Sequence, residues 1–170
     1  MERMYAPWRH DYVTGKARST GSKEIKNACV FCHQLSQNDD DKYFIVKRFT
    51  HCAVVMNYYP YNAGHLLILT YKHVGFLKDL TPLERAEIME VANASVAALE
   101  SVMKARGFNV GINMGAAAQG SIPDHLHMHV LPRWQGDTSF LETLTETTII
   151  SSDLFKTFSQ LKEHFAALNF

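Results

Sequence analysis

The sequence lacks an excess of charge of either sign. Its 170 residues include 17 Lys and Arg and 17 Asp and Glu, so it has no broad positive footprint of the kind that nonspecific nucleic-acid binding requires. Long apolar runs are also absent: no stretch is long enough to cross a bilayer, and residues 1–8 lack the apolar segment of a signal peptide. These absences argue against nucleic-acid and membrane partners and predict a cytoplasmic protein.

Cysteine is scarce, which argues against a disulfide-stapled scaffold. The chain holds 3 cysteines, an odd number, whereas secreted disulfide frameworks use an even set. Cys29 and Cys32 have the spacing of a zinc clasp, but a closed tetrahedral site needs two further ligands. The alternative is a pair of free thiols. Cys52 alternates with apolar residues and is predicted to lie in the core.

Length and composition predict a single domain over residues 1–170. An apolar fraction of 46% with 20% charged residues is ordinary for a globular protein, and 170 residues suffice for a sizeable core. Residues 1–28 show no sustained period and are interpreted as an N-terminal arm. The core is expected over 29–134, followed by a C-terminal extension with a helix over 135–170.

Hydrophobic periods predict an α+β fold, with a mainly antiparallel five-stranded sheet, a long covering helix and a C-terminal helix. The long helix has a capping box at its start, with Thr81 as N-cap, Pro82 in the first turn and Glu84 completing the box. We expect this helix to stop at Gly107. Strands are predicted over 43–47, 51–57, 65–71, 108–114 and 125–130, and the last helix over 153–168.

The most informative segment is 125–130, HLHMHV, in which three histidines alternate with three apolar residues. Read as a strand, it places the imidazoles on one face, lining a pocket wall, and the apolar side chains in the core. Read as a helix, it would pair His125 with His129 at metal-ligand spacing but give the apolar residues no common face. Pro123 and Pro132 bracket a segment of strand length, so we favour the strand.

This His-φ-His-φ-His-φ-φ pattern, where φ is apolar, resembles the signature of the histidine triad superfamily of nucleotidyl hydrolases and transferases. The resemblance covers roughly residues 43–140. It is supported by Asn57, eight residues before His65, and by Asn113 ahead of a Gly/Ser loop. The resemblance implies a HIT-like fold. The segments that look most like bacterial diadenosine tetraphosphate phosphorylases are 57–69, 107–115 and 132–137.

The resemblance implies that His127 is the nucleophile and takes up a nucleoside monophosphate, usually AMP. A neutral imidazole attacks phosphorus near pH 7 and forms a P–N bond that is easily broken again, which suits a two-step transfer. His129, one strand repeat away, would stabilise charge that grows on the phosphate or bridging oxygen. The other implied substrate contacts are Asn57 to the ribose and Asn113, Gln119, Gly120 and Ser121 to the phosphates.

Two residues allow two interpretations each. His65 either orients a triad histidine or is a buried imidazole with its hydrogen bonds satisfied. Trp134 either stacks on the second base of a dinucleotide or packs in a core or an interface.

Zinc-bearing triad proteins and the related galactose-1-phosphate uridylyltransferases have a cysteine pair, a histidine after the third strand and the first triad histidine. Here these positions are Cys29, Cys32, His73 and His125. The resemblance therefore implies a structural zinc that pins the N-terminal arm to the base of the catalytic strand, with no organic cofactor. It also implies a homodimer in which the long helix and a sheet strand meet their copies across a twofold axis. Competing ligand candidates are His33, His51 and Cys52.

The implied reaction is phosphorolysis of diadenosine tetraphosphate, in which the His127 intermediate passes AMP to inorganic phosphate and the products are ADP and ATP. The close alternative uses water as the acceptor, as a dinucleoside polyphosphate hydrolase or a nucleoside phosphoramidate hydrolase does. Two further classes are an enzyme whose three histidines hold a catalytic metal, and a nucleotide-binding module without catalysis.

Overall fold

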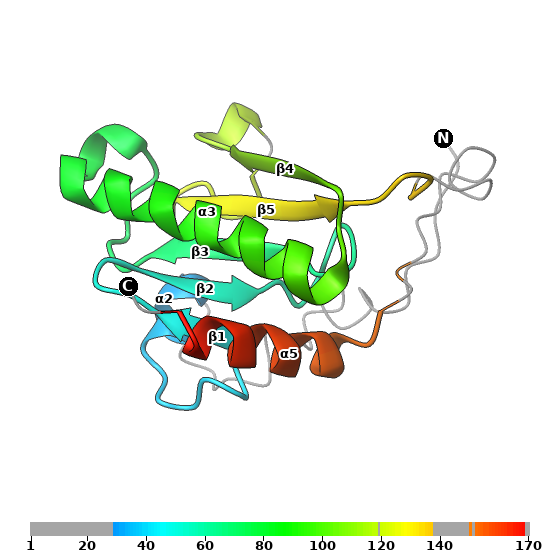
Figure 1. Ribbon diagram of the computed structural model, residues 1–170. Coiled ribbons are helices and arrows are strands. Elements are labelled where there is room, and N and C mark those ends of the chain that lie inside the picture. The colour runs from blue at the N-terminus through cyan, green and yellow to red at the C-terminus, as the bar shows by residue number, and fades with distance from the viewer. Residues whose placement is uncertain (1–28, 119, 138–149, 151, 169–170) are drawn as a thin grey trace, which may run out of the picture.

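A five-stranded antiparallel sheet organises the chain, with the strand order β1-β2-β3-β5-β4 (Figure 1). This computed structural model describes residues 29–118, 120–137, 150 and 152–168, so the interpretations of residues 1–28 and of Gln119 lie outside the described residues. The predicted α+β class is confirmed. The strands are β1 (Ile45–Arg48), β2 (Cys52–Met56), β3 (Leu66–Thr70), β4 (Gly107–Ile112) and β5 (His127–Arg133).

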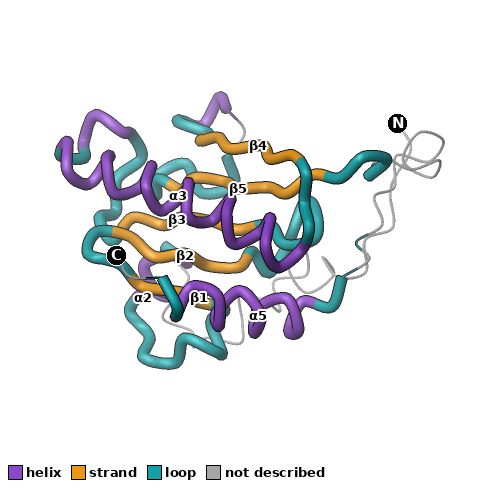
Figure 2. The backbone as a smooth tube through the Cα atoms, viewed as in Figure 1, coloured by secondary structure: helices purple, strands orange, loops and turns teal. Residues whose placement is uncertain are grey.

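Two helices, α3 (Pro82–Met103) and α5 (Leu154–Ala166), cover one face of the sheet (Figures 1 and 2). They share one core cluster with side chains of β2, β3 and β5, which explains why the apolar stripe of each helix is buried. The capping box at Thr81 and Glu84 is present as predicted. The predicted stop at Gly107 is wrong, because Lys104 takes the left-handed conformation, with φ 56°, and ends α3 earlier. Gly107 instead begins β4.

A short helix that the sequence analysis missed, α2 (Val30–Leu35), lies against the opposite face of the sheet (Figure 1). Its Phe31 belongs to a second, smaller cluster with Ile45, Val55 and Leu67. Six residues are too few for a helical period to be recognised. The two faces of the sheet are therefore unequal: one is covered by two long helices and the other carries the site described below.

β5 lies between β3 and β4, so the histidine segment has a neighbour on both sides. His129 is opposite Leu67 on β3 and Gly111 on β4. Met128 and Val130 are buried in the core beneath α3, so the imidazoles of His127 and His129 belong to the opposite face. The strand interpretation is confirmed for residues 127–130, whereas His125 and Leu126 precede β5, and the strand continues through Pro132 to Arg133 instead of ending before this proline. None of the described helices has the length and apolar composition that crossing a membrane requires.

Candidate functional site

The hydrogen bonds of His127 leave one of its ring nitrogens available for chemistry. Its Nδ1 lies 2.8 Å from the backbone oxygen of His125. A carbonyl oxygen can only accept, so Nδ1 carries the proton and donates. In the neutral ring Nε2 therefore has an unshared electron pair, as a nucleophile requires.

A second chain of hydrogen bonds fixes the proton of His129. The backbone N–H of Tyr61 donates to His65 Nδ1 at 3.2 Å, and the side-chain amide of Asn57 lies 3.1 Å from the same nitrogen. Since a backbone N–H can only donate, the proton of neutral His65 is on Nε2, which lies 2.9 Å from His129 Nδ1. His129 accepts there, so its own proton is on Nε2. Between the two interpretations of His65, this geometry favours orientation of a triad histidine.

Burial keeps these imidazoles neutral. It lowers the pKa of His65 from 6.5 to about 3, with the neighbouring His129 and His127 as further causes. Burial, followed by the neighbouring His127, lowers the pKa of His129 from 6.5 to about 4. The pKa of His127 is also lowered by burial, an effect opposed by its hydrogen bond to His125. Near neutral pH the site therefore presents neutral rings with fixed proton positions.

The turn that brings His65 to this site depends on a glycine. Gly64 has a φ of +73°, a conformation that residues with a side chain rarely adopt. A Cβ at this position would also collide with the sulfur of Met103 at the end of α3. The loop therefore packs tightly on α3 just before His65 enters the sheet region.

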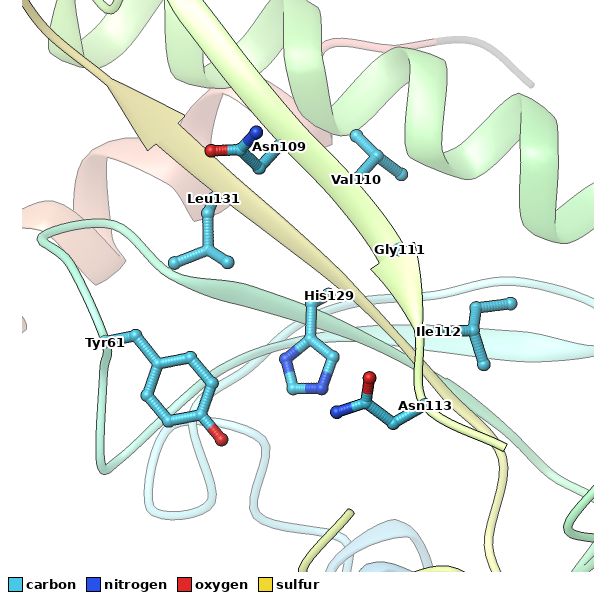
Figure 3. Close-up of a pocket in the computed structure, with 8 residues that line it drawn as sticks. All are labelled: Tyr61, Asn109, Val110, Gly111, Ile112, Asn113, His129 and Leu131. Atoms are coloured by element: carbon cyan, nitrogen blue, oxygen red, sulfur yellow. The ribbon is translucent and has the colours of Figure 1, made fainter. Parts of the chain in front are cut away.

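A cavity of about 310 Å³ opens beside His129 (Figure 3). The ring of Tyr61 and the side-chain amide of Asn113 lie on either side of the His129 imidazole. Tyr61 stacks on that imidazole, with ring centroids 5.7 Å apart and an angle of 19° between planes. The lining residues are Tyr61, Asn109, Val110, Gly111, Ile112, Asn113, His129 and Leu131.

The expectation that all three histidines line a pocket wall is wrong for this cavity, because only His129 does. His127 is only 4% exposed and His125 is fully buried. Phe31 on α2 packs edge-on against both rings, with centroid distances of 5.5 Å to His125 and 5.0 Å to His127. Phe31 of α2, a helix that was not predicted, therefore covers the His125 and His127 rings.

The four residues expected to bind zinc are brought together. Cys29 Sγ lies 3.3 Å from His125 Nδ1, Cys32 Sγ lies 3.4 Å from the Nδ1 atoms of both histidines, and those two nitrogens are 3.3 Å apart. Tetrahedral zinc with its usual bond lengths separates such ligand atoms by about 3.3–3.8 Å. The donor set Cys29, Cys32, His73 and His125 therefore fits a zinc ion.

The surroundings of this group also suit a metal. His125 Nε2 lies 2.8 Å from the backbone oxygen of Thr70, so Nε2 donates and the electron pair of Nδ1 faces the cysteines. Burial and the adjacent Cys29 raise the pKa of the Cys32 thiol, which means that a cation is needed to stabilise the thiolates. Among the described residues this is the one such group of His, Cys, Asp and Glu side chains, so the alternative of three histidines on a catalytic metal gains no support.

Two of the competing ligand candidates have other partners. Cys52 is buried on β2, as predicted, and its thiol lies 3.6 Å from the carboxylate of Glu87. The imidazole Nε2 of His51 lies 4.0 Å from the other oxygen of the same carboxylate.

The expected phosphate contacts are only partly brought together. Asn113 lines the cavity, whereas Gly120 and Ser121 do not. Gly120 nevertheless lies next to Asn113, since a Cβ on Gly120 would sit 3.6 Å from the Cβ of Asn113. Trp134 is also outside the lining, and its indole N–H donates to the backbone oxygen of Met103 at 3.2 Å, near the end of α3. This geometry favours a packing role for Trp134.

Sequence reasoning missed Tyr61 and the hydrogen bonds that hold its loop. Asn62, the next residue, donates to the backbone oxygen of Pro132 at 3.1 Å and to Asp137 at 3.3 Å. Asp137 also accepts from Arg133, at 2.6 and 2.9 Å. The available signal was the position of Tyr61 between Asn57 and His65, two residues already singled out.

Comparisons with known proteins identify the family to which this sequence is similar. The HIT domain matches residues 38–136. Over 150 residues the chain is 34% identical to a Mycobacterium tuberculosis protein named AP-4-A phosphorylase, covering 88% of this chain and 77% of that protein. Over 104 residues it is 33% identical to the asymmetrical bis(5'-nucleosyl)-tetraphosphatase of Schizosaccharomyces pombe, covering 61% and 53%.

A comparison with solved structures also finds a histidine triad family protein. A Zn-bound histidine triad family protein from Mycobacterium smegmatis superposes with a TM-score of 0.66 at 26% identity, covering 82% of this chain and 94% of that one. The expected resemblance is thereby confirmed, and the chain belongs to the HIT domain family.

Proposed function

We propose that this chain is a nucleotidyltransferase that cleaves diadenosine tetraphosphate by phosphorolysis, giving ADP and ATP. The observation that carries the proposal is the pair of fixed tautomers on β5: His127 with an electron pair on Nε2, and His129 with a proton on Nε2. The similarity to AP-4-A phosphorylase supports the choice of substrate and of phosphate as acceptor.

In the first step His127 Nε2 attacks the α-phosphorus of the substrate. A P–N bond forms, the bond to the bridging oxygen breaks, and ATP leaves while AMP stays on the ring. The His129 Nε2–H stabilises the charge that grows on the departing oxygen. In the second step an oxygen of inorganic phosphate attacks the same phosphorus and releases ADP.

The neutral state of His129 favours phosphoanhydride substrates over nucleoside phosphoramidates. A polyphosphate leaves as a stable anion and needs only a hydrogen bond, whereas an amine must gain a proton as it leaves. Burial lowers the pKa of His129 to about 4, so little of the ring is protonated at neutral pH.

The burial of His127 is part of this proposal. A phosphoramidate held in a dry site is protected from water, so the nucleotide reaches the intended acceptor more often. We expect the Phe31 side chain, which packs on the His127 ring, to shift when the substrate phosphate enters.

The remaining contacts follow the family pattern. Asn57 binds the ribose, while Asn113, Gln119, Gly120 and Ser121 contact the phosphates. Asn57 has a second task, because its amide also holds His65, and its oxygen accepts from the backbone N–H of Tyr59 at 3.0 Å. Trp134 is withdrawn from the substrate contacts because its indole is bonded to α3.

The four Cys and His ligands hold a structural zinc ion. When bound, this ion supplies the charge that stabilises the two thiolates of Cys29 and Cys32. The ion would not contact the reacting atoms, because His125 directs its ring Nδ1 toward the cysteines and only its backbone oxygen contacts His127. We further propose that two copies of the chain form a homodimer.

The test is a product analysis with diadenosine tetraphosphate, with and without inorganic phosphate. ADP and ATP are expected with phosphate, and His127→Ala should lose at least about a thousandfold in turnover while keeping nucleotide binding. His33→Ala, which removes a described histidine outside the site, serves as the matched control. Near-normal turnover of His127→Ala would refute the mechanism, and AMP release unaffected by phosphate would refute phosphorolysis.

A further inference from the structure

The proposed two-step reaction requires the leaving group and the acceptor to use one location. Displacement at phosphorus is in line, so the first leaving group departs on the side opposite His127. The second step breaks the bond to His127, so the acceptor must enter from that same opposite side. Whatever groups lie there decide which acceptor reaches the nucleotidyl group.

The cavity lies beside His129, the residue to which the proposed mechanism assigns the departing oxygen. His127, His129 and Leu131 follow one another along the same face of β5, and the cavity is lined by the last two but not by His127 (Figure 3). Gly111 on β4 is opposite His129, and a Cβ at this glycine would meet no atom within 4 Å. The open space therefore begins where the leaving oxygen would depart.

The polar groups of this cavity are hydrogen-bond donors without charge. None of its lining residues is Lys, Arg, Asp or Glu. Asn109 uses its oxygen to accept from Arg133 at 3.0 Å, so its amino group is the part that it can offer to a ligand. Tyr61 adds a phenolic hydroxyl, which Figure 3 shows at the end of the ring that points away from the loop backbone.

Tyr61 is held so that its hydroxyl stays in this place. Its backbone N–H donates to His65 at 3.2 Å, and its ring stacks on His129, although the residue is 62% exposed. A donor that is already oriented loses little freedom when it binds an anion. Inorganic phosphate offers several acceptor oxygens to such donors, whereas a water molecule gains little selectivity from them.

Resting on the proposed function, we propose that the cavity between Tyr61 and β4 is the acceptor subsite, and that the Tyr61 hydroxyl binds the inorganic phosphate that takes up the nucleotidyl group. An oxygen of this phosphate forms the new P–O bond as the P–Nε2 bond of His127 breaks, and the electron pair returns to Nε2. No proton has to be transferred and no oxidant or reductant is needed. With water as the acceptor, by contrast, a proton must be removed.

The test measures how the His127 intermediate divides between phosphate, which gives ADP, and water, which gives AMP. This product ratio is set after the intermediate has formed, so it does not depend on the rate of the first step or on the fraction of active protein. In Tyr61→Phe, which keeps the stacked ring, the ADP-to-AMP ratio at a fixed phosphate concentration should fall by about tenfold or more. Tyr58→Phe makes the same change at an exposed tyrosine outside the cavity lining and should keep the original ratio.

A second variant tests the location from the opposite wall. Gly111→Ala places a methyl group in the open space without backbone strain, because the positive φ values of the described glycines are at Gly64, Gly115 and Gly136. The ratio should fall in this variant as well. An unchanged ratio in Tyr61→Phe overturns the role of the hydroxyl, and an unchanged ratio in Gly111→Ala overturns the placement of the acceptor. If the unmodified protein makes no ADP at any phosphate concentration, the proposed phosphorolysis fails with them.

Discussion

At the scale of single residues, each histidine is assigned a task by the atom that its other nitrogen contacts. Thr70 holds Nε2 of His125, so Nδ1 turns to the cysteines. His125 then holds Nδ1 of His127 through its backbone oxygen, so Nε2 is left for attack. The proposed metal ligand and the proposed nucleophile are therefore joined by one hydrogen bond, and a shift of His125 would also move the partner that orients His127.

The buried imidazole of His65 should make the protein less stable in mild acid. Its pKa is lowered by burial from 6.5 to about 3, so the unfolded chain binds a proton that the folded chain does not. The free energy of unfolding is therefore highest above the unfolded pKa and falls as the pH drops toward the folded one, by about 2 kcal/mol at pH 5 for this group. Chemical denaturation at pH 7 and pH 5 should show a smaller loss in His65→Gln than in the unmodified protein. Equal losses in both proteins would contradict this assignment.

The sequence predicts local alternation well and long-range stacking poorly. The pattern HLHMHV placed the core and site faces of β5 correctly, because side-chain alternation in a strand depends only on neighbouring residues. Tyr61 was not predicted as a site residue, because its contact with His129 depends on the path of the 57–64 loop. The two interpretations of Trp134 stayed open for the same reason, because the partner of its indole N–H depends on where α3 ends.

At the scale of elements, α2 connects the group of Cys29, Cys32, His73 and His125 to β5. It begins directly after Cys29, carries Cys32, and places Phe31 against His125 and His127. A helix of six residues has little stability of its own. We therefore expect its position to depend on the small apolar cluster around Phe31 and on the four proposed zinc ligands.

Removal of one cysteine ligand should release the metal and weaken the attachment of α2. In Cys29→Ser, protein purified without added zinc should hold much less metal than the unmodified protein, since affinity falls by more than about tenfold, and should melt at a lower temperature. Elemental analysis and thermal denaturation measure the two effects. His33→Gln, which changes a histidine of the same helix outside the group, should keep its metal. An unmodified protein without bound metal would rule out the structural zinc.

Helix starts were predicted more accurately than helix ends. The start of α3 is written in the chain as a capping box, in which Thr81 and Glu84 bond each other's backbone N–H groups. Its end was assigned to Gly107 because glycine is the usual left-handed residue, yet Lys104 adopts that conformation. Because α3 ends at Met103, residues 104–106 form the loop, and Gly107 becomes the first residue of β4, opposite Arg133. Pairing with β5, which sequence alone does not reveal, decided the boundary.

At the scale of the whole molecule, the two edges of the sheet differ. The β1 edge is held by the chain around it, because Arg48 donates to the backbone oxygens of Leu35 and Gln37 at 2.9 and 2.8 Å. β4 forms the other edge, and Asn109, Val110 and Gly111 at its centre are exposed. An exposed edge strand presents a row of backbone groups that can pair with another strand.

This edge is where we expect the second copy of the chain. Two β4 strands related by a twofold axis would pair antiparallel and join the sheets, and Val110, 44% exposed at the centre of the strand, would come to lie at the axis. Analytical ultracentrifugation should therefore give twice the 19.3 kDa mass of one chain. Val110→Lys should shift the protein to the monomer, because two like charges would meet at the axis. Phe155→Lys, at an exposed apolar residue on α5, should leave the dimer intact. A monomeric unmodified protein would refute the dimer, and a dimer that tolerates Val110→Lys would place its interface on another surface.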